Sequence, residues 1–207
     1  MTEEESFKQK FEAACAKIEK LQEELRNERR KREEAELRST NDGLTGLLTR
    51  DAFDADGEPR YLRARRGGSL VTMVFIDANG FKTVNDTHGH ETGDDLLRAI
   101  AEAIKLSKRP ADLAGRKGGD EFLLFFEGAT IRQTRNVADR LHGAVERIRL
   151  ARIQDLRASV SIGAVVGIPD RMLNWKDLIG LADHAMYEAK KHKGTNQPTI
   201  CIRPLDT

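Results

Sequence analysis

Gly118-Gly119-Asp120-Glu121-Phe122 is the stretch from which the organisation of this chain is predicted. The aromatic-rich apolar run that continues to Phe126 is typical of a short buried strand. Two adjacent glycines before it favour a tight reversal, because glycine adopts positive φ without steric cost. We therefore expect a β-hairpin that carries Asp120 and Glu121 at its turn.

Two carboxylates held side by side at a rigid turn repel each other, so a cation between them would stabilise the arrangement. Hard oxygen ligands suit Mg²⁺, which keeps several waters and takes its remaining ligands from phosphates. The alternative interpretation is an ordinary Gly-Gly hairpin with two solvated acids. The pentapeptide alone leaves both interpretations open.

Composition restricts the class of protein. The 207 residues are 39% hydrophobic and 33% charged, which is typical of one globular domain with an appendage. A formal net charge of +1 argues against a nucleic-acid partner or an anionic membrane surface. No apolar stretch is long enough for a membrane span. The distant Cys15 and Cys201 predict reduced thiols in a cytoplasmic setting and no structural zinc cluster.

Residues 1–40 contain neither Gly nor Pro, and their apolar positions alternate in spacings of four and three. These positions are Phe7, Phe11, Ala14, Ile18, Leu21 and Leu25. The heptad pattern predicts a helix that pairs with a copy of itself as a parallel coiled coil. A solvated, partly frayed helix is the alternative. We expect residues 1–40 to be a stalk for dimerisation and signal transmission, and residues 41–207 to be the second domain.

Polar residues follow the predicted buried strand from Ser69 to Ile76. The strand ends at Asp77, and a turn with Gly80 comes next. An acid at a strand end beside a turn with free backbone N–H groups suits a metal and phosphate site. A helix cap would explain Asp77 alone. An EF-hand loop fails here because Phe81 and Lys82 stand where it needs an acid and a glycine, and the chain has no Walker A loop.

The remaining pattern alternates helices and strands. A helix is expected from Arg50 towards Arg66, interrupted at 56–59, and a second has an apolar face that runs from Leu96 to Leu106. Later elements are helices at 131–150 and 175–193, a strand at 157–166 and a closing edge strand at 199–202. This order predicts an α+β layer architecture.

Five segments between residue 42 and about 197 resemble the GGDEF family, the diguanylate cyclases. Besides the hairpin, the similar segments are Leu44–Arg50, Asp77–Leu97, Ser159–Gly163 and Ala182–Lys190. Thr49 and Asn79 depart from the usual Asn and Asp, and an extra residue near Thr195 leaves the phosphate-contact register there uncertain. The resemblance implies a nucleotidyl-cyclase-like fold with a mostly antiparallel central sheet flanked by helices.

The resemblance also implies an activity. Members condense two GTP molecules into cyclic di-GMP and two pyrophosphates, using Mg²⁺, two per active site, or Mn²⁺, in a dimer of facing domains. The implied metal ligands are Asp77, Asp120 and the carbonyl of Ala78. The implied catalytic residues are Asp120, Glu121 and Lys82.

The implied substrate-binding residues are Asn85, Asp94, Gly80, Phe81, Gly119 and Lys190. Asn85 and Asp94 would read guanine, whose two adjacent donors match one carboxylate, so we expect GTP rather than ATP. An inhibitory site for the product is implied at Arg109, Asp112 and Arg140. The R-x-x-D pattern recurs at 152–155 and 203–206, and solvated arginines are the alternative.

Two other functions stay open at this point. One is a catalytically silent module that binds GTP or cyclic di-GMP and signals through its helix, and the other is a coiled-coil adaptor. The intact hairpin together with Asp77, Lys82 and Asn85 favours the enzyme. The sequence does not name the input signal, so an upstream sensor or activator protein is an expected partner.

Overall fold

The computed structural model describes residues 17–28, 40–150, 153, 156–191 and 199–205. The chain divides into two units, Met1–Ser39 and Thr40–Thr207. In the first unit, residues 17–28 are helical, and Ile18, Leu21 and Leu25 are each 54% exposed. The other apolar positions of the heptad pattern, Phe7, Phe11 and Ala14, lie outside the described residues. The dimerisation and signalling roles of this unit stay predictions.

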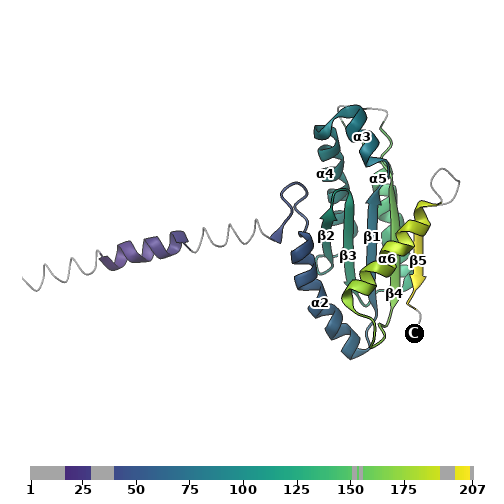
Figure 1. Cartoon of the computed structure of the whole chain (residues 1–207). Coiled ribbons are helices and arrows are strands. Elements are labelled where there is room, and N and C mark those ends of the chain that lie inside the picture. Colours follow the sequence, from purple (N-terminus) through teal and green to yellow (C-terminus); the bar gives the residue numbers. More distant parts are fainter. Residues whose placement is uncertain (1–16, 29–39, 151–152, 154–155, 192–198, 206–207) are drawn as a thin grey trace, which may run out of the picture. The chain divides into compact units, whose positions relative to one another are not determined.

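The second unit is built on one five-stranded sheet in the order β2-β3-β1-β4-β5 (Figure 1). The strands are β1 (Val71–Ala78), β2 (Leu113–Gly118), β3 (Glu121–Glu127), β4 (Val160–Gly167) and β5 (Ile200–Pro204). All neighbours pair antiparallel except β4 and β5, which are parallel. The predicted α+β class with a mostly antiparallel sheet is confirmed.

Helices cover both faces of this sheet (Figure 1). They are α2 (Arg50–Gly67), α3 (Phe81–His88), α4 (His90–Ser107), α5 (Ile131–Glu146) and α6 (Trp175–Lys190). α2 and α6 pack on one face, where Phe53, Tyr61 and Phe125 surround the ring of Trp175. α4 and α5 pack on the other face. No described helix has the length and apolar character that a membrane crossing needs.

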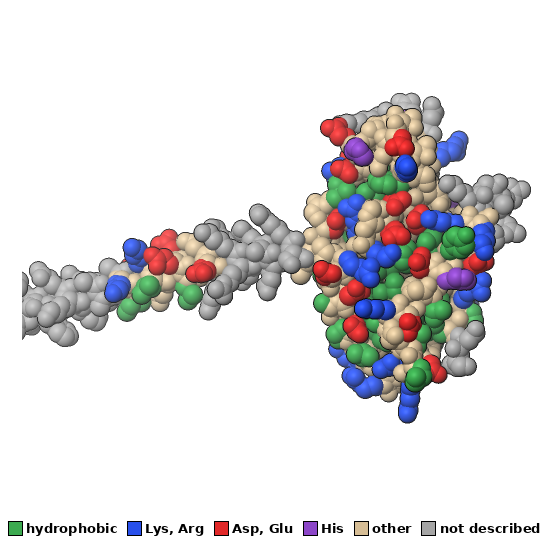
Figure 2. All heavy atoms as spheres, in the orientation of Figure 1, with side chains coloured by type: hydrophobic (Ala, Val, Ile, Leu, Met, Phe, Trp, Pro, Cys, Tyr) green, Lys and Arg blue, Asp and Glu red, His purple; other side chains and the backbone are tan. Residues whose placement is uncertain are grey.

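The central strand β1 is buried along its whole length because both faces of the sheet are covered. Its side chains alternate between the two cores, with Phe75 towards α2 and α6, and Ile76 towards α4. Gly163 on β4 lets α6 approach closely, since a Cβ there would lie 1.9 Å from the Met186 nitrogen. Charges of both signs are interspersed on the face shown in Figure 2, in keeping with the near-zero net charge.

Several expectations about elements were wrong. α2 is continuous through residues 56–59, with an exposed Pro59 inside it, where water can replace the lost hydrogen bond. Buried Gly57 fits there because a Cβ would lie 2.4 Å from the ring of Trp175. Leu106 is 82% exposed instead of facing the core. α5 ends at Glu146 and α6 at Lys190, earlier than predicted.

Candidate active site

Three acids meet where β1 ends and β3 begins. Asp77, one residue before the end of β1, lies opposite Glu121, the first residue of β3. Directly opposed residues of antiparallel strands point to the same face, so these two carboxylates are neighbours. The Ala78 nitrogen donates to the Asp120 carbonyl at 3.1 Å, which places the third acid beside the same strand end.

Glycines and an arginine shape the turn that carries Asp120. Gly119 has φ +53, a left-handed conformation that favours glycine. Arg116 Nε and Nη2 donate to the Gly119 carbonyl at 2.9 and 2.7 Å. Arg116 Nη1 lies 3.2 Å from both carboxylate oxygens of Asp42. One guanidinium therefore ties the turn to the loop that precedes α2.

The electrostatics of the site are dominated by its acids and two lysines. Burial raises the pKa of Asp77, and the nearby charges of Asp120 and Glu121 raise it further. Lys190 Nζ lies 2.8 Å from Asp77 Oδ2 and opposes that rise. Lys117 Nζ lies 2.8 Å from Glu121 Oε2. The three carboxylates at the strand ends therefore face two lysines, which leaves an excess of negative charge.

This donor set fits a hard divalent cation. Asp77 and Asp120 supply carboxylates, and like-charge repulsion around Asp77 is what a bound cation would relieve. Within the described ranges, no group of three or more His, Cys, Asp or Glu side chains is placed to hold a metal. Mg²⁺ does not require one, because it commonly takes one or two carboxylates and completes its shell with water and phosphate.

The segment after β1 forms α3 and α4. Gly80 has φ +72 and directs the chain into α3, so the backbone N–H groups of Gly80 and Phe81 lie at a helix N-terminus. Lys82 on the first turn of α3 is exposed. Among the residues that the structure describes, Lys82 makes no ion pair with the acids, whereas Lys190 pairs with Asp77.

Asn85 packs against α4 at the α3–α4 corner. A Cβ at Gly93 would lie 1.9 Å from Asn85 Oδ1, so this glycine, which precedes Asp94 in the sequence, gives the Asn85 side chain its place. Asn85 Oδ1 is buried and has no hydrogen-bond partner among the described residues. A buried polar atom without a partner costs stability, which a bound ligand at this corner would recover.

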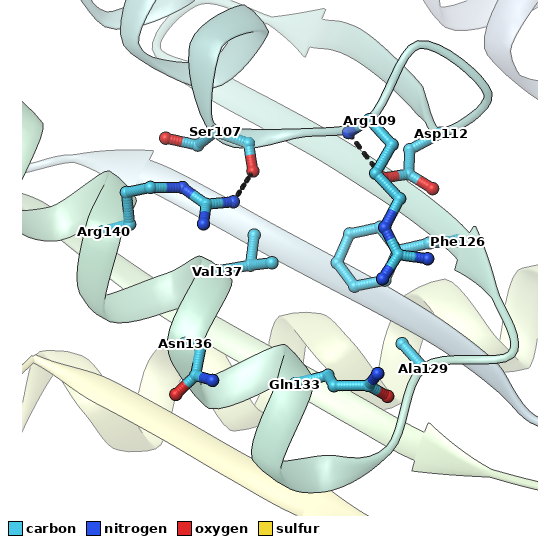
Figure 3. A pocket seen from close by; sticks show the side chains of 9 residues that line it. All are labelled: Ser107, Arg109, Asp112, Phe126, Ala129, Gln133, Asn136, Val137 and Arg140. Carbon is cyan, nitrogen blue, oxygen red and sulfur yellow. Dashed lines mark hydrogen bonds between the residues drawn. The ribbon is translucent and has the colours of Figure 1, made fainter.

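A cavity of about 200 Å³ lies between the loop before β2 and helix α5 (Figure 3). Arg109, Asp112 and Arg140, the three residues of the implied inhibitory site, all line it. Asp112 Oδ2 accepts from the Arg109 nitrogen at 2.8 Å, which shapes the loop. Arg140 Nη2 donates to the Ser107 carbonyl, as the dashed line in Figure 3 marks.

Comparison with known proteins decides the family. Residues 39–197 match the family model described as diguanylate cyclase, GGDEF domain. The chain belongs to the GGDEF family. It is 37% identical over 160 residues to diguanylate cyclase DosC of Escherichia coli, a match that covers 75% of this chain and 34% of DosC. It is 32% identical to diguanylate cyclase VdcA of Vibrio cholerae, covering 72% and 43%. The chain thus spans about a third of the length of the first curated relatives.

Solved GGDEF structures share the fold. The coiled coil and GGDEF domain of DgcB from Caulobacter crescentus, in complex with c-di-GMP, superposes with a TM-score of 0.77 at 27% identity, covering 95% of this chain and 99% of that one. Diguanylate cyclase SiaD of Pseudomonas aeruginosa, in complex with its activator SiaC, gives a TM-score of 0.71 at 26% identity, covering 96% and 76%.

Sequence reasoning missed several residues that shape this GGDEF site. Arg116 and Lys117 directly precede the Gly-Gly pair, and a basic pair beside an acidic turn was a readable signal. Gly93 stands next to Asp94, but its close contact with Asn85 needs the three-dimensional structure. Ser161, which donates to Asn79 Oδ1 at 2.8 Å, lies 82 residues away in sequence and gave no local signal.

Proposed function

We propose that this chain condenses two GTP molecules into cyclic di-GMP and releases two pyrophosphates. The observation that carries the proposal is the meeting of Asp77, Asp120 and Glu121 at adjacent strand ends, with Lys190 bound to Asp77. Membership of the GGDEF family supports it. The reaction needs concentrated negative charge to hold cations and a neighbouring cation for phosphate, and this strand end supplies both.

Asp77, Asp120 and the carbonyl of Ala78 are proposed to hold Mg²⁺, two ions per site, with Mn²⁺ as a substitute. When bound, the metal neutralises the triphosphate and lowers the pKa of the attacking ribose 3′-hydroxyl. Lys190 and Lys82 add positive charge for the phosphates. Glu121 completes the acidic rim of the site.

The N-terminus of α3 is proposed to bind the phosphates, because no side chain in the described part of the chain caps this end, where Gly80 and Phe81 present backbone N–H groups. The guanine is proposed to bind at the α3–α4 corner. There Asp94 would accept from the N1–H and N2–H₂ donors, and Asn85 would bind the base edge. Gly119 leaves room for the nucleotide at the turn.

Two domains are proposed to face each other, because each would bind one GTP and the reaction joins two. The half-exposed Ile18, Leu21 and Leu25 of the N-terminal helix supply an apolar stripe for self-association. Pairing through this helix would raise the effective concentration of the second half-site. An upstream sensor or activator protein acting on the helix, and a cytoplasmic location, are part of this proposal.

Feedback by the product is proposed at the cavity of Arg109, Asp112 and Arg140. Guanidinium groups bind phosphates and the O6 and N7 edge of guanine. A cavity of about 200 Å³ beside them offers room for part of a cyclic dinucleotide. The same cavity favours the second candidate function, a silent receptor of cyclic di-GMP, because effector binding there does not require turnover.

Incubation of the purified protein with GTP and Mg²⁺, followed by chromatography of the products, tests the proposal. Cyclic di-GMP is expected from the wild type and not from Asp120→Ala. A protein that binds GTP and forms dimers but releases no cyclic product would transfer the assignment to the silent receptor.

A further inference from the structure

The three acids of the candidate site, Asp77, Asp120 and Glu121, differ in their counter-ions. Asp77 is paired with Lys190, and Glu121 is paired with Lys117, each at 2.8 Å. Asp120 makes no side-chain hydrogen bond or ion pair in the part of the chain that the structure describes. The protein therefore neutralises two of these carboxylates itself and leaves the third to an external cation.

Lys117 is fixed in its position by the fold of the hairpin. The register of β2 against β3 shifts between Arg116 and Gly118, so Lys117 is the extra residue of a β-bulge. A bulge re-aims the side chain it carries. Lys117 Nζ lies 4.7 Å from the ring centroid of Phe75, which is fully buried. The ammonium group is thereby directed at Glu121 rather than into solvent.

Lys117 is only about one quarter exposed, and Glu121 one third. An ion pair at this depth is screened less than a surface pair, so an incoming divalent cation has to compete with Lys117 for Glu121. Asp120 offers no such competition. The partition of the acids is thus built into the hairpin before any ligand binds.

We propose that Lys117 is a positioning residue that holds Glu121 as an internal ion pair, so that Asp77 and Asp120 receive the metal. The inference rests on the proposed function, since it assumes that the acids bind a divalent cation. Without Lys117, Glu121 is free to enter the metal shell. The cation then binds more tightly when no nucleotide is present. Glu121 would occupy a coordination position that an oxygen of the triphosphate would otherwise take.

Titration of the 207-residue chain with Mn²⁺ alone tests this, with free Mn²⁺ measured by electron paramagnetic resonance. Lys117→Met is expected to tighten Mn²⁺ binding about three- to tenfold, because a positive charge leaves and a carboxylate becomes available. Lys117→Arg keeps the pair and is expected to stay near the wild-type value. Lys117→Gln, which keeps polarity at the position, is titrated beside Lys117→Met in case the latter does not fold.

Lys191→Met is the matched control. Lys191 also combines an ion pair, with Glu188 at 2.6 Å, and a ring contact, with Tyr187 at 5.2 Å, but it is exposed and directly follows the last residue of α6. Its removal is expected to leave Mn²⁺ affinity within about twofold of wild type, since screening weakens the field of an exposed charge.

A double-mutant cycle separates positioning from charge at a distance. In a Glu121→Gln background, Lys117→Met is expected to tighten Mn²⁺ binding clearly less than in the wild-type background, because only the loss of the lysine charge remains. Equal tightening in the two backgrounds would overturn the inference, and so would an unchanged affinity of Lys117→Met in the wild-type background. Absence of any Mn²⁺ binding by the wild type would instead refute the metal site of the proposed function.

Discussion

The two ends of the β2–β3 hairpin present different charged groups. At the turn, Asp120 and Glu121 stand beside Asp77, whereas the loop that leads into β2 carries Arg109 and Lys108. The six residues of β2 separate these ends by about 20 Å. One hydrogen-bonded ladder therefore holds the proposed cation site at one end and the proposed product site at the other, too far apart to share a residue.

Each end is also held by one arginine that binds a backbone carbonyl and a carboxylate. Arg116 binds the Gly119 carbonyl and Asp42 at the turn. At the other end, Arg60 on α2 binds the Ala111 carbonyl at 2.9 Å and pairs with Asp56. The two ends are therefore similar in how they are fixed and different in what they present, which makes them separable by mutation.

The largest expected effect comes from removing an acid at the turn. Asp120→Ala is expected to lower the initial rate of cyclic di-GMP formation by at least about 100-fold, because the proposed metal loses a ligand. Asp95→Asn is the control, since it removes a carboxylate on α4 that pairs with Arg98. A rate for Asp120→Ala within threefold of the Asp95→Asn rate would contradict a catalytic role for the turn.

At the opposite end, Arg109→Ala and Arg140→Ala are expected to raise the half-inhibitory concentration of cyclic di-GMP about 10- to 100-fold. Each removes charge-assisted hydrogen bonds of roughly 1.5–3 kcal/mol. Inhibition is measured against each variant's own uninhibited rate. Arg132→Ala removes an exposed arginine of α5 outside the cavity and serves as the control. Inhibition that survives both substitutions would place the effector elsewhere.

Separate substitution of Arg116 and Arg60, the arginines that hold the two ends, gives a smaller expected effect and a sharper test. Arg116→Gln is expected to slow turnover about three- to tenfold, whereas Arg60→Gln should leave turnover near wild type and weaken product inhibition a few-fold. Both should cost about 1–2 kcal/mol of stability, since each loses bonds of the same kind. Equal effects of the two variants on turnover would show that the ends are not independent.

The smallest expected effect concerns stability and pH. Burial and neighbouring acids raise the pKa of Asp77 in the folded state, so its ionisation costs stability as pH rises through the folded pKa. Asp77→Asn is neutral throughout. Its melting temperature in chelator is therefore expected to exceed that of wild type by a few degrees, roughly 2–4 °C per kcal/mol, at pH 7. The difference should shrink below pH 4, and a constant or reversed difference would refute this account of Asp77.

The hairpin, the strand before Asp77 and the α+β class could be predicted because each depends on local patterns: adjacent glycines, short apolar runs and their order. The continuous α2 could not be predicted, because glycine and proline within four residues are typical of a helix break. Only packing against Trp175 explains the glycine at position 57. Leu106 was misplaced because helical periodicity does not say where the core ends.

In the candidate site, too, some features could be predicted from local sequence and others depend on packing. Its acids stand in recognisable sequence segments, and the family resemblance named them. The lysines that pair with those acids were not assigned to them, because Lys117 reaches Glu121 through a β-bulge and Lys190 reaches Asp77 from a helix 113 positions later. Such contacts follow from register and packing, which a sequence pattern does not specify.

The most direct test of the central claim is one time course of the wild-type protein with excess GTP and Mg²⁺, in which cyclic di-GMP is quantified throughout. The account predicts cyclic di-GMP at once, with a rate that declines as product accumulates, long before GTP is consumed. A parallel course with Arg109→Ala should stay linear for longer. A nucleotide-bound wild-type protein that yields no cyclic di-GMP would contradict the account.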